Sequence, residues 1–235
     1  MIFVQFIGAV RSGHNFVGQL INAHRRAVIS NEINTIRMFK ENDPPREKLH
    51  QKIMFEADQF VQRGADHVWY NFDIGHYQGK TTEYDVIGDS YCGNFVKKLK
   101  PEQVSDYEIY TGCELRFIWV MRHPVDQVIS FTRFDSENVC TSPLKYTGVF
   151  MGQYEYANKL CTKAPTLILT YNRLINEPQE TLETMLEFLR LDDDEEYFEA
   201  CKKKIFAKPV TYKDHPEYGQ LKEILHKYII EYETL

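Results

Sequence analysis

The residues that are most clearly suited to binding or catalysis lie near the start of the chain, between Gly8 and Asn15. Gly8 and Gly13 have the spacing of a glycine loop that wraps a phosphate between a strand and a helix. Free backbone N–H groups at the start of such a helix bind oxyanions. Arg11, inside the loop, adds a planar cation that suits the same anion. The pattern therefore predicts an anion site, and the alternative is a tight turn with an exposed arginine.

The two residues that follow the second glycine restrict the kind of anion. They are His14 and Asn15, whereas a nucleoside triphosphate loop carries a lysine and then a serine or threonine. The lysine that reaches the terminal phosphates and the hydroxyl that binds magnesium are both absent from these positions. The sequence therefore predicts a phosphate site that does not perform the usual Mg-ATP chemistry.

A second candidate site follows the apolar run at residues 115–120. Arg122 comes at the carboxyl end of this run, where parallel α/β sheets place their ligands. Pro124 suits the first turn of a helix, and Ser130 lies about two turns farther along it. We expect Arg122 and Ser130 to hold one phosphate, with Arg133 as an additional contact. The alternatives are a surface ion pair for Arg122 and solvent-facing helix positions for Ser130 and Arg133.

The elements that must position these residues alternate along the chain. Short runs rich in β-branched and aromatic residues are followed by amphipathic helical patterns, which predicts an α/β fold with a central, mostly parallel sheet of about five strands flanked by helices. The expected strands are residues 2–7, 27–29, 85–87, 115–120 and 166–169. The runs at 115–120 and 167–169 show no polar alternation, so we expect both to be buried on both faces.

One stretch, residues 42–80, does not follow this alternation. Its first four residues, Asn-Asp-Pro-Pro, break the chain, residues 47–62 have a helical pattern, and residues 67–80 are polar and aromatic without a clear period. We expect a single domain over residues 1–235, with an irregular insertion or flap at about 42–80.

The composition limits the class of partner. The chain has 235 residues, with 28 Lys and Arg against 34 Asp and Glu, for a net charge of −6. An acidic chain lacks the broad basic face that nucleic acid requires, and no apolar run approaches the about 20 residues of a membrane span. The five scattered cysteines, with no export signal, predict reduced thiols in a cytoplasmic protein. We expect no metal, because neither the cysteines nor the carboxylates have ligand spacing.

Together, these segments resemble the PAPS-dependent sulfotransferases (PAPS is 3′-phosphoadenosine 5′-phosphosulfate). Members carry Arg-Ser-Gly and two hydroxyl residues after the first strand, and later an arginine and a serine eight positions apart. Residues 11–15 match the first pattern except at His14 and Asn15, and Arg122 and Ser130 match the second. Further matches, in the family's order, occur at residues 22–32, 86–89 and 169–178. The resemblance is nearer to the tyrosylprotein, Golgi-type and bacterial branches than to the cytosolic branch.

The resemblance implies a three-layer fold similar to that of P-loop proteins. It also implies transfer of a sulfuryl group from PAPS to a hydroxyl or amine, with adenosine 3′,5′-bisphosphate (PAP) as the product. We expect the acceptor to be a small molecule, a lipid or a carbohydrate, bound by the irregular and aromatic residues 34–80 and 140–156. Two alternatives remain open: a P-loop nucleotide kinase or hydrolase, and a degenerate relative that binds nucleotide without turnover.

The resemblance also assigns roles within the site. The donor-binding residues that it implies are Arg11, Ser12, Gly13, His14, Asn15, Arg122, Ser130, Arg133 and Tyr171. Glu32 is the implied catalytic base, and Arg11 and His14 would stabilise charge on the leaving group. His76 is the rival base, because cytosolic members use a histidine. The alternative for Glu32 is a capping carboxylate on a helix over residues 31–40.

One further departure from the family pattern concerns residue 90. Ser90 stands where many members carry a lysine after Gly-Asp, and that lysine would help to neutralise the leaving group. Lys80, Lys97 and Lys98 are the candidates to replace it.

Overall fold

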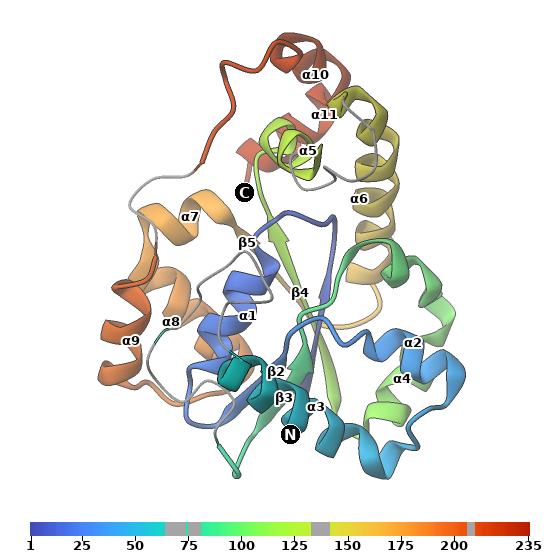
Figure 1. Ribbon diagram of the computed structural model, residues 1–235, viewed down its shortest axis with the longest axis vertical. Coiled ribbons are helices and arrows are strands. Elements are labelled where there is room, and N and C mark those ends of the chain that lie inside the picture. Colours follow the sequence, from blue (N-terminus) through green and yellow to red (C-terminus); the bar gives the residue numbers. More distant parts are fainter. Residues whose placement is uncertain (64–73, 75–80, 133–141, 206–209) are drawn as a thin grey trace.

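The computed structural model describes residues 1–63, 74, 81–132, 142–205 and 210–235. Its centre is a five-stranded sheet in the order β2-β3-β1-β4-β5, flanked by helices (Figure 1). The strands are β1 (Ile2–Ile7), β2 (Ala27–Ser30), β3 (Val86–Asp89), β4 (Glu114–Met121) and β5 (Thr166–Thr170). Each pairing in this order is parallel. The predicted α/β fold is therefore confirmed, and its sheet is wholly parallel.

Helices flank the sheet, and helices α10 and α11 lie at the top of the molecule in Figure 1. The α-helices are α1 (His14–Asn22), α2 (Thr35–Glu41), α3 (Arg46–Arg63), α4 (Val104–Thr111), α5 (Pro124–Thr132), α6 (Thr147–Cys161), α7 (Tyr171–Asn176), α8 (Pro178–Leu189), α9 (Glu195–Lys202), α10 (Tyr218–Ile224) and α11 (His226–Glu233). In Figure 1, α7, α8 and α9 lie together on the left of the sheet, and α2 and α4 lie on the right. Helices α10 and α11 pack against α5. No helix in the described ranges is both long and apolar enough to cross a membrane.

Strands β1 and β4, in the middle of the sheet, are buried almost throughout. Phe3 and Phe6 of β1 and Phe117 of β4 are completely buried. Since all strands run in the same direction, the loops after β1, β2, β3 and β4 leave the same edge of the sheet. This edge brings the glycine loop and Arg122, which are distant in sequence, to one end of the fold.

Two sequence predictions about the sheet and its helices are wrong in part. Strand β5 is at the edge of the sheet, and Ile168 is 38% exposed, so β5 is not buried on both faces as we expected. The helix expected over residues 31–40 starts only at Thr35, because Glu32 (φ 58°) and Asn34 (φ 64°) have left-handed backbone conformations. The side chain of Asn34 caps this helix by accepting from the N–H of Arg37. The alternative role of Glu32 as the cap is therefore excluded.

The irregular stretch at residues 42–80 begins with the helix that its pattern predicted. Helix α3 buries Leu49, Ile53 and Ala57 and packs against β2. Beyond α3, Ile74 is the one residue of this stretch that the structure describes. The single domain and the flap remain predictions.

Candidate functional site

The glycine loop joins the carboxyl end of β1 to the start of α1, as its spacing predicted. Gly8 (φ 101°) and Gly13 (φ 98°) both have left-handed backbone conformations, which favour glycine. A Cβ atom at Gly8 would lie 2.4 Å from the Trp119 ring, and one at Gly13 would lie 2.8 Å from the Tyr171 ring. Both positions therefore require glycine for two independent reasons, the backbone conformation and the aromatic ring that covers it.

The start of α1 can bind an anion. Gly13 occupies the cap position, and no side chain caps the helix. The first N–H groups of a helix have no partner within it and carry the positive end of the helix dipole. Arg11, half-buried, also has a left-handed conformation (φ 67°), and Ser12 beside it is completely buried. The loop therefore presents backbone donors and a guanidinium in one short segment.

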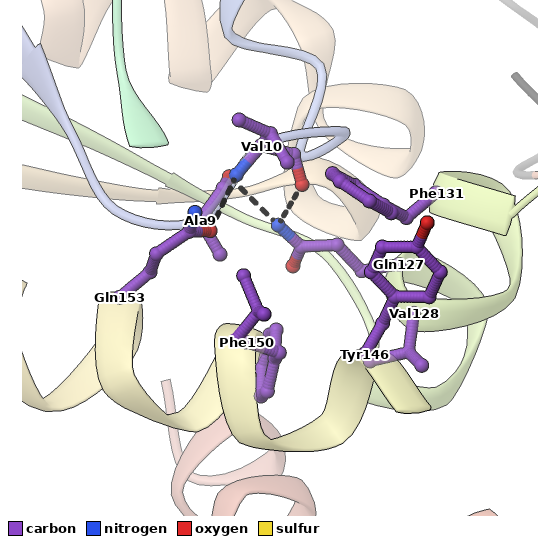
Figure 2. A pocket seen from close by; sticks show the side chains of 9 residues that line it. Ala9, Val10, Gln127, Val128, Phe131, Tyr146, Phe150 and Gln153 are labelled. Atoms are coloured by element: carbon purple, nitrogen blue, oxygen red, sulfur yellow. Dashed lines mark hydrogen bonds between the residues drawn. The ribbon is translucent and has the colours of Figure 1, made fainter. Parts of the chain in front are cut away.

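Two glutamines, which the sequence analysis did not identify, hold the first half of the loop. The Nε2 atom of Gln127, on α5, donates to the carbonyl oxygens of Ala9 and Val10 at 2.8 Å each. The N–H of Val10 donates to Oε1 of Gln153, on α6, at 3.2 Å (Figure 2). Both glutamines are almost completely buried. Nothing in the sequence separates them from ordinary helix glutamines, because their partners are more than a hundred residues away.

A narrow pocket lies beside these glutamines (Figure 2). Its volume of about 10 Å³ has room for about one water molecule. The wall is mainly aromatic and includes Phe131, Tyr146 and Phe150. Tyr146 and Phe150 belong to the stretch that we expected to bind the acceptor, but a pocket of this size does not hold one as it stands.

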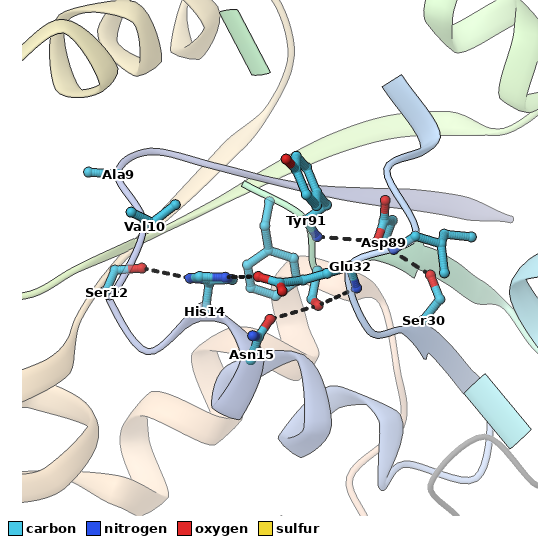
Figure 3. A network of polar contacts seen from close by, with 12 residues as sticks. Ala9, Val10, Ser12, His14, Asn15, Ser30, Glu32, Asp89 and Tyr91 are labelled. Atoms are coloured by element: carbon cyan, nitrogen blue, oxygen red, sulfur yellow. Dashed lines mark hydrogen bonds and ion pairs between the residues drawn. The ribbon is translucent and has the colours of Figure 1, made fainter. Parts of the chain in front are cut away.

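The structure brings His14 and Glu32 together. Nε2 of His14 lies 2.8 Å from Oε1 of Glu32, and Nδ1 of His14 lies 3.3 Å from Oγ of Ser12 (Figure 3). Partial burial raises the pKa of Glu32, but hydrogen bonds from His14 and Asn15, together with the positive charge of Arg11, outweigh it and lower this pKa below 4.5. Glu32 is therefore an ionised carboxylate at neutral pH. An ionised carboxylate only accepts, so Nε2 of His14 donates to it.

The backbone of Glu32 is also held. Its N–H donates to Oγ of Ser90 at 3.3 Å, and the Ser90 hydroxyl in turn donates to Oδ1 of Asn15 at 3.0 Å. Ser90 is completely buried. Glu32 is thus connected to the glycine loop through its side chain and through its main chain.

Asp89 fixes the residues that follow Glu32. Its completely buried carboxylate accepts from the N–H of Thr35 at 2.8 Å, the hydroxyl of Thr35 at 3.1 Å, the N–H of Ile33 at 3.1 Å and the N–H of Tyr91 at 3.2 Å. Burial raises the pKa of Asp89 to about 6, against the opposing effect of these hydrogen bonds. In the sequence, Asp89 was visible only as part of a family pattern, without a role.

Arg122 and Ser130, the predicted phosphate-binding residues of the second candidate segment, lie where the sequence predicted, after β4 and on α5, but Arg122 is partly exposed and Ser130 is buried. Arg122 follows β4, and its Nη2 donates to the carbonyl oxygen of Val210 at 2.6 Å. The Arg122 guanidinium also lies 6.0 Å from the ring centre of Tyr171 and 5.6 Å from that of Tyr212. Ser130, on α5, is 3% exposed, so it does not face solvent. Both are described residues, and no hydrogen bond joins them. Tyr171, which covers Gly13, links this segment to the glycine loop.

Some predicted site residues lie outside the described residues. These are Arg133, the rival base His76, and Lys80. Of the remaining lysine candidates, Lys97 extends towards Gly152 of α6, and Lys98 is exposed. Within the described ranges, no group of three or more His, Cys, Asp or Glu side chains is arranged to hold a metal ion.

Comparison with known proteins gives a match at the level of the fold. No protein-family model and no curated protein matches the sequence. A sulfotransferase domain from the curacin biosynthetic pathway has 12% identity and a TM-score of 0.55, over 96% of this chain and 97% of that chain. The sulfotransferase domain of the Synechococcus PCC 7002 olefin synthase has 14% identity and a TM-score of 0.52, over 96% and 94%.

Mouse sulfotransferase SULT7A1, in complex with PAP, has 11% identity and a TM-score of 0.50, over 91% of this chain and 68% of that chain. All three are sulfotransferase structures, and each match covers more than nine tenths of this chain. The chain has the sulfotransferase fold.

Proposed function

We propose that the protein is a sulfotransferase that moves a sulfuryl group from PAPS to a hydroxyl or amine of a small-molecule, lipid or carbohydrate acceptor. One observation carries this proposal. The chain has a sulfotransferase fold, and in it the ionised carboxylate of Glu32 lies 2.8 Å from Nε2 of His14. His14 is in the first turn of α1, and the N-terminus of this helix has no side-chain cap. An anion site and a base therefore lie side by side at the carboxyl edge of the sheet.

The residues at this edge suit the two anionic ends of PAPS. The uncapped start of α1, with Arg11 and Ser12, would hold the 5′ end. Arg122, Ser130 and Tyr171 would hold the 3′-phosphate, with Arg122 also donating to the Val210 carbonyl. When bound, PAPS supplies a sulfuryl group on a phosphate that leaves as PAP.

The residues of the chain would contribute by placement and charge. Sulfuryl transfer resembles phosphoryl transfer in needing alignment and charge stabilisation more than covalent help. Arg11 and the N–H groups of the loop stabilise negative charge that develops on the leaving phosphate oxygen. Glu32 takes the proton of the acceptor hydroxyl, for which it must lie within about 3 Å of that oxygen. His14 keeps the Glu32 carboxylate ionised and oriented.

Two measurements test the proposal. The first is transfer of ³⁵S from labelled PAPS to a panel of phenols, sterols, sugars and amines. The second is thermal denaturation with PAP or with Mg-ATP, where a ligand at about 100 times its Kd adds about 2.7 kcal/mol to the stability of the folded state. We expect at least one labelled product, and stabilisation by PAP but not by Mg-ATP. Stabilisation by Mg-ATP alone would indicate a kinase or hydrolase instead. PAP binding without any labelled product would indicate a relative that binds nucleotide but has no activity.

A further inference from the structure

Three residues depart from the sulfotransferase pattern, and the structure gathers them around Glu32. We infer that His14, Asn15 and Ser90 form one clamp that fixes Glu32 for catalysis, in which Asn15 and Ser90 are positioning residues. This inference rests on the proposed function, because it assumes that Glu32 is the base. Taken one by one, the substitutions at His14, Asn15 and Ser90 look like losses of the donor contacts that other sulfotransferases make. The clamp gives the three residues one shared role.

The clamp is needed because the backbone of Glu32 is strained. Its φ angle of 58° is in the left-handed region, which a residue with a long side chain adopts only when its surroundings impose it. Two residues farther on, Asn34 has the same conformation. A turn of this kind, without a tether, would relax and carry the carboxylate away from the loop.

Three contacts impose the conformation. Nε2 of His14 holds the carboxylate at 2.8 Å. Oγ of Ser90 accepts from the N–H of Glu32 at 3.3 Å, and donates to Oδ1 of Asn15 at 3.0 Å. The Asn15 side chain also lowers the pKa of the Glu32 carboxylate. His14, Asn15 and Ser90 therefore act together on the side chain and the main chain of Glu32.

The position of Ser90 excludes a direct catalytic role. Ser90 is completely buried, so it presents no surface to a substrate. Helix α1 also approaches it closely, because a Cβ atom at Gly18 would lie 3.0 Å from Cβ of Ser90. A lysine at position 90 would have to bury its charge beneath α1, which is costly without a partner. Ser90 therefore serves the site through Glu32 and not in place of the missing lysine.

Several charged or titratable groups lie around Glu32, and a test based on the Glu32 pKa must take them into account. Arg11 and His14 face it from the loop, while Tyr91 and Cys92, after β3, feel its charge. The pKa of each of the last two is raised, by burial first and then by Glu32, so both are neutral at pH 7. Tyr91 and Cys92 therefore add no charge of their own to the titration of Glu32 below pH 7.

The test is the pKa of Glu32, measured by ¹³C NMR of glutamate side chains, with its signal identified by its absence in Glu32→Gln. In Asn15→Asp, which keeps the side-chain shape, the second carboxylate should raise the Glu32 pKa by about one pH unit or more. In Ser90→Ala, the Glu32 main chain loses its tether, so the carboxylate should move away from His14 and the Glu32 pKa should rise above its wild-type value. An unchanged Glu32 pKa in Asn15→Asp, or in folded Ser90→Ala, would overturn the clamp.

A second readout separates positioning from folding. Ser90→Ala should keep its affinity for PAP within about twofold, but transfer of ³⁵S from PAPS should fall about tenfold or more, because a misplaced base is a poor one. Thr181→Val is the matched control: it also removes an almost completely buried hydroxyl, but one that donates to the Glu177 carbonyl oxygen at the start of α8 and has no contact with Glu32. Equal transfer rates in the two variants would contradict the inference. If Glu32→Gln itself retains activity, the proposed base fails, whereas the NMR measurement still decides the clamp.

Discussion

The buried carboxylate of Asp89 should make the protein less stable as the pH rises through 6. Two effects oppose each other at this residue, since complete burial favours the neutral acid and the hydrogen bonds from Thr35, Ile33 and Tyr91 favour the carboxylate. Burial prevails, and the pKa rises from 3.8 to about 6. At about 1.4 kcal/mol for each pH unit, this difference corresponds to about 3 kcal/mol.

The direction of the effect follows from proton binding. Between pH 4 and pH 6 the folded protein holds a proton on Asp89 that the unfolded chain has released, so stability falls as the pH rises. The contribution of the protonated form is complete below about pH 3.8 and lost above about pH 6. Asp89→Asn has no such titration, and its rearranged hydrogen bonds add an offset that does not depend on pH.

Urea unfolding at pH 4, 5, 6 and 7 measures this effect. The unfolding free energy of the wild type, relative to Asp89→Asn, should decrease by about 2 kcal/mol between pH 4 and pH 7, because part of the full difference already falls below pH 4. Asp106→Asn, on the exposed side of α4, is the control substitution. A difference that increases with pH would refute the reasoning, because it would mean that the hydrogen bonds outweigh burial.

Further predictions concern the loop and Glu32. Gly13→Ala should weaken PAP binding, measured by calorimetry, about tenfold or more, because residue 13 has a left-handed backbone and its new Cβ would lie 2.8 Å from the Tyr171 ring. Gly148→Ala is the control and should leave PAP binding unchanged, because the space around Gly148 is open. Glu32→Gly should be about 1 kcal/mol more stable than Glu32→Ala in urea unfolding, since glycine relieves the strain at φ 58°. Gln127→Leu should cost about 1–3 kcal/mol in thermal denaturation, because two buried carbonyl groups lose their donor. The acid limb of kcat/KM should lie below pH 4.5, and a limb above pH 5 would contradict the lowered pKa of Glu32.

The sequence predicts the parallel sheet well because the information is local. The strand runs carry β-branched and aromatic residues, and the glycine spacing of the loop is visible without any knowledge of its neighbours. The exposure of Ile168 was missed, because a strand's place at the edge depends on the order of strands and not on its own residues. The late start of α2 was missed for a similar reason. The left-handed turn at Glu32 depends in part on residues more than fifty positions away, since Ser90 accepts from the N–H of Glu32 and Asp89 accepts from the N–H of Ile33.

The site is predicted less completely than the fold. The family resemblance selected Glu32 and His14 separately, but not their contact, which requires the loops after β1 and β2 to meet. Gln127 and Gln153 gave no signal, because a buried hydrogen-bonding side chain is recognisable only from its partners. Ser90 was noted only as a departure from the family pattern, without its partners Glu32 and Asn15. The reason for each loop glycine was equally hidden, since the covering rings come from β4 and α7.

The most direct test of the account is the transfer of ³⁵S from labelled PAPS by Glu32→Gln, measured beside its affinity for PAP. The amide keeps the shape of the side chain but cannot take a proton, so transfer should fall by about a hundredfold or more while PAP affinity stays within about twofold. Glu187→Gln, an exposed carboxylate on α8, should match the wild type in both measurements. Full transfer activity in Glu32→Gln would contradict the central claim that the carboxylate beside His14 is the catalytic base.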